Sequence, residues 1–274
     1  MVWCMESPFS DIQDEQPLGG LEARGGLLSE ALRGYVPIRK TFVQLPNTSA
    51  TRPSVLGALV HARQGVALQL LLLGLALEPI RGLNLAPARW AQMLRFRSRP
   101  VSTTQVLRAV GQLQERGLVD QGASRRGLEL NLLREDASRQ PYTRPAGGEG
   151  GKGYFLLPHV AWDSGLLDSL SLPGLAAFLI TLHDTHQKPS FRASYEQFAG
   201  WYGISERSAE RGFRELASRG LLLSHPQKIQ DLRSPSGLRT VWWRALQDPY
   251  STSARQRLQA LARNRAAKAG GSRP

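Results

Sequence analysis

The feature that most constrains the fold is an internal duplication, because one order of segments occurs twice along the chain. Each copy starts near a short apolar segment, FVQLP in the first and YFLLP in the second. An apolar run follows (GVALQLLLLGLAL and GLAAFLITLHDTH), then WAQMLRF and FAGWYGI, then STTQVLRAVGQLQERGLV and SERSAERGFRELASRGLL. Four matches in one order predict two related folding units. A length of 274 residues is enough for two domains with cores of their own.

Each copy is predicted to fold as helix, short strand, helix, turn, helix and hairpin. The apolar run 66–77 contains Gln69 and is too short for a membrane span, which needs about 20 residues, so we expect a core helix there. Apolar strands on both sides of polar Gly, Ser and Pro loops indicate hairpins at 117–133 and 220–246. The turn RFRSRPVS makes the first copy longer than the second between its last two helices.

The last helix of the second copy, at about 205–218, is predicted to be amphipathic. Spacings of three and four residues place Ala209, Phe213 and Leu216 on one face, which has to be buried. Ser205 is expected to cap the start of this helix and Gly220 to follow its end. In the first copy Val106, Val110 and Leu113 take the corresponding buried positions, and Ser102 with Gln105 forms a capping-box pattern.

A second face of the same helix carries Arg207, Arg211 and Arg214. Two interpretations of this arginine stripe are open from the helix alone. It is either a solvated face, on which neighbouring glutamates pair with the arginines, or a surface that contacts nucleic acid.

This order of elements resembles the winged helix-turn-helix family. The segment YEQFAGWYGISERSAERGFRELASRGLL is especially similar to the helix-turn-helix core, with Phe198 and Ala199 on its first helix, Gly203 in the turn and Ile204 entering the core. The resemblance implies a mainly α protein with small β wings, built as two winged-helix domains joined by a flexible linker. It also implies that the helices at 102–115 and 205–218 are recognition helices for the DNA major groove, each followed by a basic wing beside the backbone.

The candidate DNA-binding residues lie on the recognition helices and the hairpins. In the second copy they are Ser205, Arg207, Ser208, Arg211, Arg214, Lys228, Arg233 and Arg239, and in the first copy Ser102, Thr103, Thr104, Arg108, Arg125 and Arg126. Arginine can form a bidentate pair with guanine or neutralise a phosphate, and the sequence does not distinguish these roles. The groove-facing positions of the first copy, Thr104, Arg108 and Gly111, are less basic. That copy is therefore expected to contact DNA less, or to serve mainly for dimerisation.

The charge balance favours an anionic partner. The formal net charge is +13 and the isoelectric point about 10.8. Residues 1–30 hold six acidic residues against one arginine, a net of −5, so the remainder carries +18. Such a field favours nucleic acid or acidic membrane surfaces. The partners we expect are double-stranded DNA and, in dimerisation, a second copy of the chain, and we expect no membrane partner. Arginine greatly outnumbers lysine, which suits phosphate and guanine, although a GC-rich genome gives the same ratio.

The predicted organisation has five parts. They are an acidic, poorly ordered segment at 1–41, a first winged-helix domain at 42–133, a flexible linker at 134–153, a second winged-helix domain at 154–248 and a basic tail at 249–274. The linker sequence AGGEGGKG lacks the first glycine and the Ser or Thr of a phosphate-binding loop, so nucleotide binding is not predicted. The tail is either solvated or a nonspecific DNA-gripping arm.

No constellation of catalytic or metal-binding residues is recognised. Cys4 is the only cysteine, which excludes an internal disulfide and a thiolate zinc cluster and fits a reducing cytoplasm. His183 and His186 lie near no cysteine and few carboxylates, so a structural or solvated role is expected for them. The start of the chain is not typical of a secretory signal. We therefore expect no enzyme activity, cofactor or metal, and a cytoplasmic protein associated with the nucleoid or a plasmid.

The function predicted from these observations is double-stranded DNA binding, first as a sequence-specific transcription regulator. The alternative is a plasmid replication initiator that binds repeated origin sites, since such initiators also resemble tandem winged-helix chains of this length. A third class is an architectural or chromosome-segregation adaptor whose winged helices contact protein. The high positive charge argues against this third class.

Overall fold

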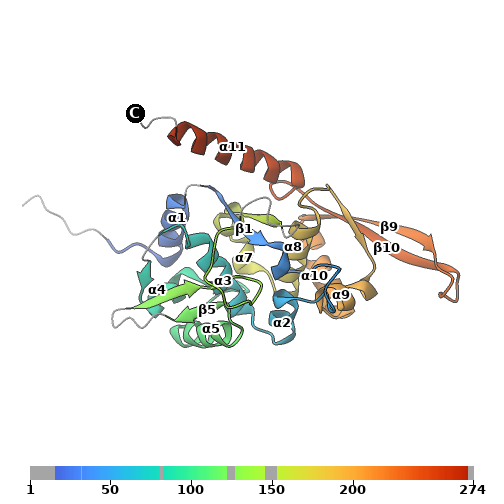
Figure 1. Cartoon of the computed structure of the whole chain (residues 1–274), viewed down its shortest axis with the longest axis horizontal. Helices are drawn as coiled ribbons and strands as arrows, with labels where there is room; N and C mark the ends of the chain where they lie inside the picture. Colours follow the sequence, from blue (N-terminus) through green and yellow to red (C-terminus); the bar gives the residue numbers. More distant parts are fainter. Residues whose placement is uncertain (1–15, 32, 81–82, 122–126, 146–152, 271–274) are drawn as a thin grey trace, which may run out of the picture.

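The computed structural model describes residues 16–31, 33–80, 83–121, 127–145 and 153–270 (Figure 1). Helices account for 48% of this part and strands for 20%, in small antiparallel sheets, so the chain belongs to the mixed α/β class. The strand content exceeds that of the predicted mainly α protein for two reasons. One hairpin is long, and an additional two-stranded sheet forms between segments far apart in the sequence.

The predicted order of helices and strands is confirmed in both copies. The first copy contains α2 (Val55–His61), α3 (Gly65–Leu77), β2 (Asn84–Leu85), α4 (Pro87–Met93), β3 (Arg95–Phe96), β4 (Arg99–Pro100), α5 (Thr103–Glu115), β5 (Val119–Gln121) and β6 (Leu128–Leu132). The second contains α6 (Val160–Asp163), α7 (Leu166–Ser169), α8 (Leu172–Asp184), β8 (Phe191–Ala193), α9 (Tyr195–Tyr202), α10 (Glu206–Ser218), β9 (Leu222–Gln230) and β10 (Leu238–Leu246). The three-stranded sheets also match, with strand orders β2-β6-β5 and β8-β10-β9.

The start of each copy differs from the sequence-based alignment. YFLLP forms β7 (Tyr154–Pro158), but FVQLP forms no strand, because it begins at the end of the 3-10 helix η1 (Lys40–Phe42). The true counterpart of β7 is β1 (Tyr35–Arg39), and the two strands pair antiparallel. Tyr35 lies opposite Pro158 and Arg39 opposite Tyr154, so corresponding residues exchange places about the pair Pro37 and Leu156. This register relates the two strands to each other by a local two-fold.

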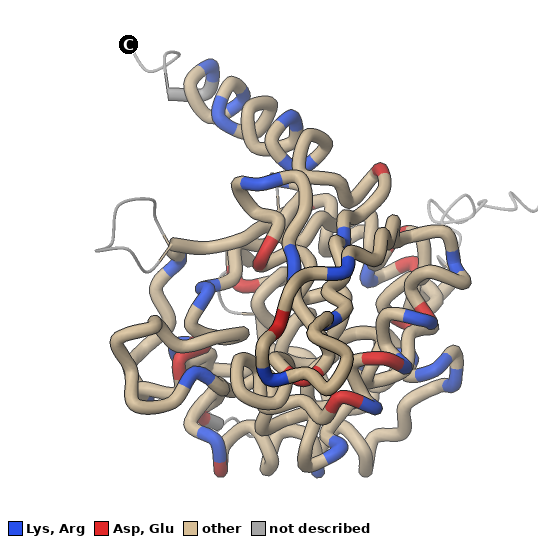
Figure 2. Tube along the Cα trace, turned by 90° about the vertical axis from the view of Figure 1, so that its right-hand side faces the viewer, with Lys and Arg blue, Asp and Glu red and all other residues tan. Residues whose placement is uncertain are grey.

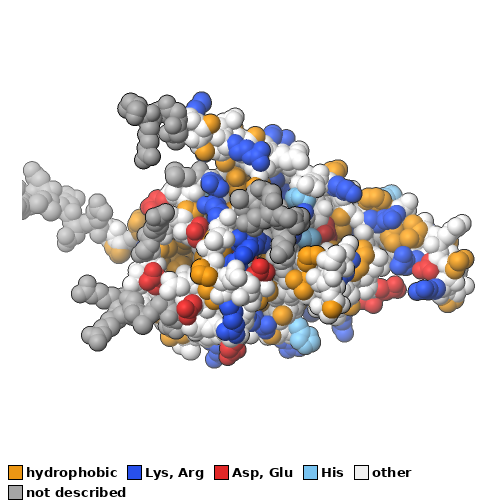
Figure 3. All heavy atoms as spheres, in the orientation of Figure 1, with side chains coloured by type: hydrophobic (Ala, Val, Ile, Leu, Met, Phe, Trp, Pro, Cys, Tyr) orange, Lys and Arg blue, Asp and Glu red, His pale blue; other side chains and the backbone are white. Residues whose placement is uncertain are grey.

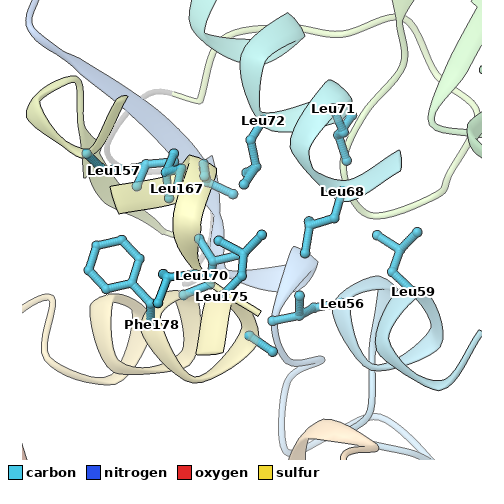
Figure 4. Close-up of a cluster of buried hydrophobic side chains, with 14 of the residues drawn as sticks. Leu56, Leu59, Leu68, Leu71, Leu72, Leu157, Leu167, Leu170, Leu175 and Phe178 are labelled. Atoms are coloured by element: carbon cyan, nitrogen blue, oxygen red, sulfur yellow. The ribbon is translucent and has the colours of Figure 1, made fainter. Parts of the chain in front are cut away.

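The copies pack directly on each other. Helix α2 of the first copy packs against α8 of the second, and α7 of the second packs against β3 of the first. The Gln69 side-chain amide donates a hydrogen bond to the carbonyl of Leu167 at 2.5 Å, and the Ser98 N–H donates to the carbonyl of Asp168 at 2.8 Å. Figure 4 shows leucines of both copies meeting in one layer, and the buried apolar residues form one continuous cluster.

The segments outside the two predicted domains are largely structured where they are described. In the predicted poorly ordered segment 1–41, α1 (Gly20–Glu30) packs against α4, and its Arg24 forms a buried ion pair with Asp168 at 2.7 Å. In the predicted flexible linker, Glu135 is fully buried and pairs with Arg39 at 2.6 Å. These ionic contacts hold α1 and residues 134–135 on the core, whereas the linker sequence at 146–152 lies outside the described residues.

The predicted tail forms helix α11 (Thr252–Gly270), which leads away from the body of the molecule (Figures 1 and 2). Its root is fixed by Arg255, whose guanidinium donates to the carbonyls of Leu182 and Thr185 at 3.0 and 2.9 Å, at the end of α8. Arg255 is buried there and therefore belongs to the core, while the other basic residues of α11 are exposed. Figure 2 shows Lys and Arg along this helix with no acidic residue among them.

Candidate nucleic-acid interface

Helix α10 forms as its sequence predicts. Ser205 caps its start by accepting a hydrogen bond from the Ser208 N–H at 3.3 Å. Ala209, Phe213 and Leu216 are all buried, and most of their face packs against α8. The axes approach closely because Gly212 faces the carbonyl of Pro173, where a Cβ would lie only 2.2 Å from the oxygen. The opposite face of α10 is thereby left toward solvent.

The arginine stripe lies on that solvent face, and its members have different partners. Arg207, Arg211 and Arg214 are all exposed. Arg214 pairs with Glu210 at 2.5 Å, as the solvated-face interpretation predicts, although both side chains remain largely exposed. Arg207 and Arg211 form no ion pair within the described residues. These two guanidinium groups are therefore available to an external anion, which supports the second interpretation for them.

Glu215 is engaged elsewhere. One of its oxygens accepts from the Ser171 N–H at 3.0 Å, and the other accepts from the Ser171 hydroxyl. Glu215 also pairs with Arg219 at 3.3 Å. This carboxylate joins the end of α10 to the start of α8, so it fixes the angle at which the arginine stripe is presented.

A basic hollow of about 650 Å³ lies between the two copies at the start of α10. Its lining includes Ser205, Ser208 and Arg211 from the second copy, and His61, Arg63, Phe96 and Arg97 from the first. None of the described residues that line it is acidic. A hollow with three arginines and hydroxyl donors suits phosphate groups.

Arg63 and Arg97 were not among the predicted site residues. Both have a left-handed backbone, with φ of 57° and 52°, in the turns that bring them to the hollow. The only sequence signal for Arg97 is the longer turn RFRSRPVS, which forms the β3–β4 hairpin. No local pattern marks Arg63. Both residues reach the site only because the copies pack together.

The candidate residues of the first copy surround the start of α5. Ser102 forms a capping box with Gln105, as predicted, and Ser102, Thr103, Thr104 and Arg108 are exposed. The far end of α5 is fixed by Arg116, which donates to the Gln64 side chain at 2.6 Å. The turn before α5 contributes Arg97 to the basic hollow, whereas none of Ser102, Thr103, Thr104 and Arg108 lines it. Arg125 and Arg126 lie outside the described residues.

The hairpin of the second copy carries its predicted residues on an extended arm. Lys228 on β9 and Arg233 in the loop are exposed. Arg239 is half-buried and pairs with Asp231 across the hairpin at 3.4 Å. Arg239 therefore stabilises the loop, while Lys228 and Arg233 form no ion pair within the described residues.

Beneath α10 lies a buried arginine that the sequence analysis missed. Arg244 of β10 is 1% exposed, and its guanidinium carbon lies 4.2 Å from the ring centroid of Phe213 and 4.9 Å from that of Tyr195. One of its N–H groups donates to the carbonyl of Ala193 at 3.1 Å. Burial lowers the pKa of Arg244, and its contact with Tyr195 opposes this shift. Aromatic faces from α9 and α10 stabilise the charge. Together with the bond to Ala193 of β8, these contacts join β8, β10, α9 and α10 beneath the arginine stripe.

The two histidines considered as metal ligands are placed differently. His183 is buried and bonds Asp184 at 2.8 Å, and Asp184 also accepts the hydroxyl of Tyr202. Burial, together with nearby Lys40, lowers the pKa of His186 to about 4. Within the described ranges, no three or more His, Cys, Asp or Glu residues gather as a metal site would require.

No family model, curated protein or solved structure matches the chain. Across the described ranges, every helix is too short or too polar to serve as a membrane span.

Proposed function

We propose that the chain binds double-stranded DNA through two winged-helix units, with α10 as the main recognition helix. The observation that carries this proposal is the free guanidinium pair of Arg207 and Arg211 on the solvent face of α10. Arg211 lines a hollow together with Arg63 and Arg97, and no described residue of its lining is acidic. The chain as a whole carries +13, which attracts a polyanion.

The shared order of elements supports the winged-helix assignment. In both copies a short strand lies between the first and second of three helices, and the hairpin after the third helix completes a three-stranded sheet with it. In such a unit the third helix enters the major groove and the hairpin contacts the adjacent backbone. Helices α5 and α10 are the third helices here. The weaker charge on α5 makes the first copy the secondary contact.

The local two-fold relation suggests how the target is arranged. The antiparallel pairing of β1 with β7 relates these two strands by a local two-fold. We propose that the same relation extends to α5 and α10, which would then match two half-sites in inverted orientation. A single chain then supplies what a dimeric regulator obtains from two subunits. We expect one chain on each site.

The first role we propose is sequence-specific transcription regulation, and the second is plasmid replication initiation. The packing of the two copies in one chain favours replication initiation in one respect. A single chain can occupy each of the repeated sites of an origin. Repression of a reporter fused to the promoter of its own gene supports a regulator. Protection of directly repeated sites beside an AT-rich region supports an initiator. If the chain binds no duplex, the third class, an adaptor that contacts protein, is favoured instead.

The experiment that tests DNA binding is a selection of duplexes from a random library with the full chain. The selected duplexes are then footprinted, and the mass of the complex is measured. We expect one enriched motif with two half-sites and one chain per duplex. A library that shows no enrichment after repeated rounds contradicts sequence-specific binding.

A further inference from the structure

The hairpin β9–β10 projects beyond the rest of the molecule (Figure 1). Its strands pair over nine positions, from Leu222 opposite Leu246 to Gln230 opposite Leu238. Strand β8 covers only Trp242 to Arg244, near the root. At about 3.4 Å per residue the strands reach about 30 Å, and the outer half is a ribbon of two strands. Nearly every side chain of the outer half is exposed or half-buried.

The loop at the tip has a defined conformation. The Asp231 N–H donates to the carbonyl of Gly237 at 2.9 Å, and the Ser234 N–H donates to the carbonyl of Asp231 at 3.1 Å. The Asp231 carboxylate accepts from the Arg233 N–H at 3.0 Å and pairs with Arg239. Gly237 adopts φ of 69°, which closes the loop. These bonds engage the one acidic residue of 222–246.

The fixed tip presents Leu232 entirely to solvent, at 102% relative exposure. Exposed single leucines are common on protein surfaces, so exposure alone assigns no role. The setting of Leu232 differs from that of an isolated surface leucine. It stands at the end of a ribbon, next to the free cation Arg233, and Figure 3 shows hydrophobic and basic side chains together over this ribbon.

The tip and the recognition helix share one groove. It has a volume of about 990 Å³ and is lined by Leu232 and Arg233 from the loop, and by Glu196 and Glu206 at the starts of α9 and α10. A duplex along α10 therefore meets the hairpin as well. The two glutamates repel phosphate in this groove, so we expect the backbone contacts to come from Lys228 and Arg233 on the ribbon.

We propose that this ribbon enters the minor groove of the DNA bound by α10, and that Leu232 inserts between two base pairs and bends the duplex. The inference rests on the proposed DNA binding. Apolar side chains at the ends of basic elements act in this way, because a partly unstacked base step offers an apolar slot and the bend brings more phosphates to the protein. Arg233, the residue after Leu232, supplies charge beside that slot, and Lys228 lies farther along β9 toward the root.

The test uses a duplex selected by the wild-type chain and labelled at its ends with a fluorescence donor and acceptor. Anisotropy gives Kd, and energy transfer gives the bend. The variants are Leu232→Ser, the matched control Leu223→Ser, and Arg233→Ala. Leu223 is on the same hairpin near its root and is 58% exposed. Both serine variants are expected to melt like the wild type, because neither leucine is part of the core.

We expect the wild type to bend the duplex by about 20–90°. Leu232→Ser should lose most of the bend while its Kd rises by less than about tenfold, and Leu223→Ser should bend like the wild type. Arg233→Ala should keep the bend and lower the salt slope by about one unit. A full bend with Leu232→Ser overturns the inference, as does a wild type that binds without bending, although DNA binding then stands. A wild type that binds no duplex overturns both.

Discussion

Replacing Phe213 by alanine tests whether α10 is supported as described. Phe213 is 3% exposed, and its ring lies 5.2 Å from that of Phe198 and 4.2 Å from the Arg244 guanidinium carbon. Truncation of a buried phenylalanine costs about 3–5 kcal/mol, and a desolvated cation–π contact about 2 kcal/mol. Because these contributions overlap, we expect Phe213→Ala to lower the free energy of unfolding by about 5 kcal/mol.

The assay is urea unfolding followed by tryptophan fluorescence. Phe213→Leu should cost about 2 kcal/mol, since it keeps most of the volume and loses the ring. When Arg244 is already replaced by methionine, Phe213→Leu should lower the free energy of unfolding by about 1–2 kcal/mol less than it does in the wild type, because the cation is gone. Arg214→Ala, on the exposed face one residue along, should stay within about 0.5 kcal/mol of the wild type. An unfolding free energy that Phe213→Ala leaves nearly unchanged, or equal costs in both backgrounds, would refute this account of the support.

Three further predictions concern pH, packing and salt. Burial lowers the pKa of His159 to about 4, so below about pH 6.5 the unfolded chain binds a proton that the folded chain does not. Stability should therefore fall by about 3 kcal/mol between pH 6.5 and 4, and urea titrations of His159→Gln should show a smaller fall. A Cβ on Gly57 would lie 2.1 Å from the carbonyl oxygen of Tyr202, so Gly57→Ala should lower Tm by about 4–10 °C, whereas Gly25→Ala, with nothing within 4 Å, should not. The logarithm of DNA affinity should fall linearly with that of salt, by about 0.9 per neutralised phosphate, and a flat response would count against phosphate contacts.

The sequence was sufficient for features that depend on neighbouring residues. The bounds of α5 and α10 follow from caps at Ser102 and Ser205 and from buried residues at helical spacing, and both were predicted within one residue. The duplication itself predicted the order of elements in each copy. Such signals are local, so a single sequence reveals them.

The packing of the copies was not predictable in the same way. The strand YVPIR was missed because its partner lies far along the chain, in β7. The ion pair of Arg24 with Asp168 and that of Arg39 with Glu135 join segments that look like an acidic tail and a linker when each is considered alone. Burial of such charges depends on the partner being present, and no local pattern states which partner that is.

The candidate site was therefore predicted in part. Arg207 and Arg211 were identified from helical spacing, and both are exposed. Arg63 and Arg97 join them only through the contact between the copies, and Arg244 supports them through three aromatic rings contributed by α9 and α10. A stripe on one helix is visible in a sequence, whereas a surface assembled from several elements requires the structure.

The most direct test of the central claim is a titration of the variant with Arg207, Arg211 and Arg214 all changed to alanine. Selected and scrambled duplexes are compared at several salt concentrations, with melting curves alongside. We expect unchanged melting, a loss of about 1–3 kcal/mol for each arginine that contacts a base, and a salt slope smaller by about one unit for each that contacts a phosphate. The matched variant Arg108→Ala should lose less. A triple variant that binds both duplexes as tightly as the wild type would mean that the stripe is a solvated face, and would contradict DNA recognition by α10.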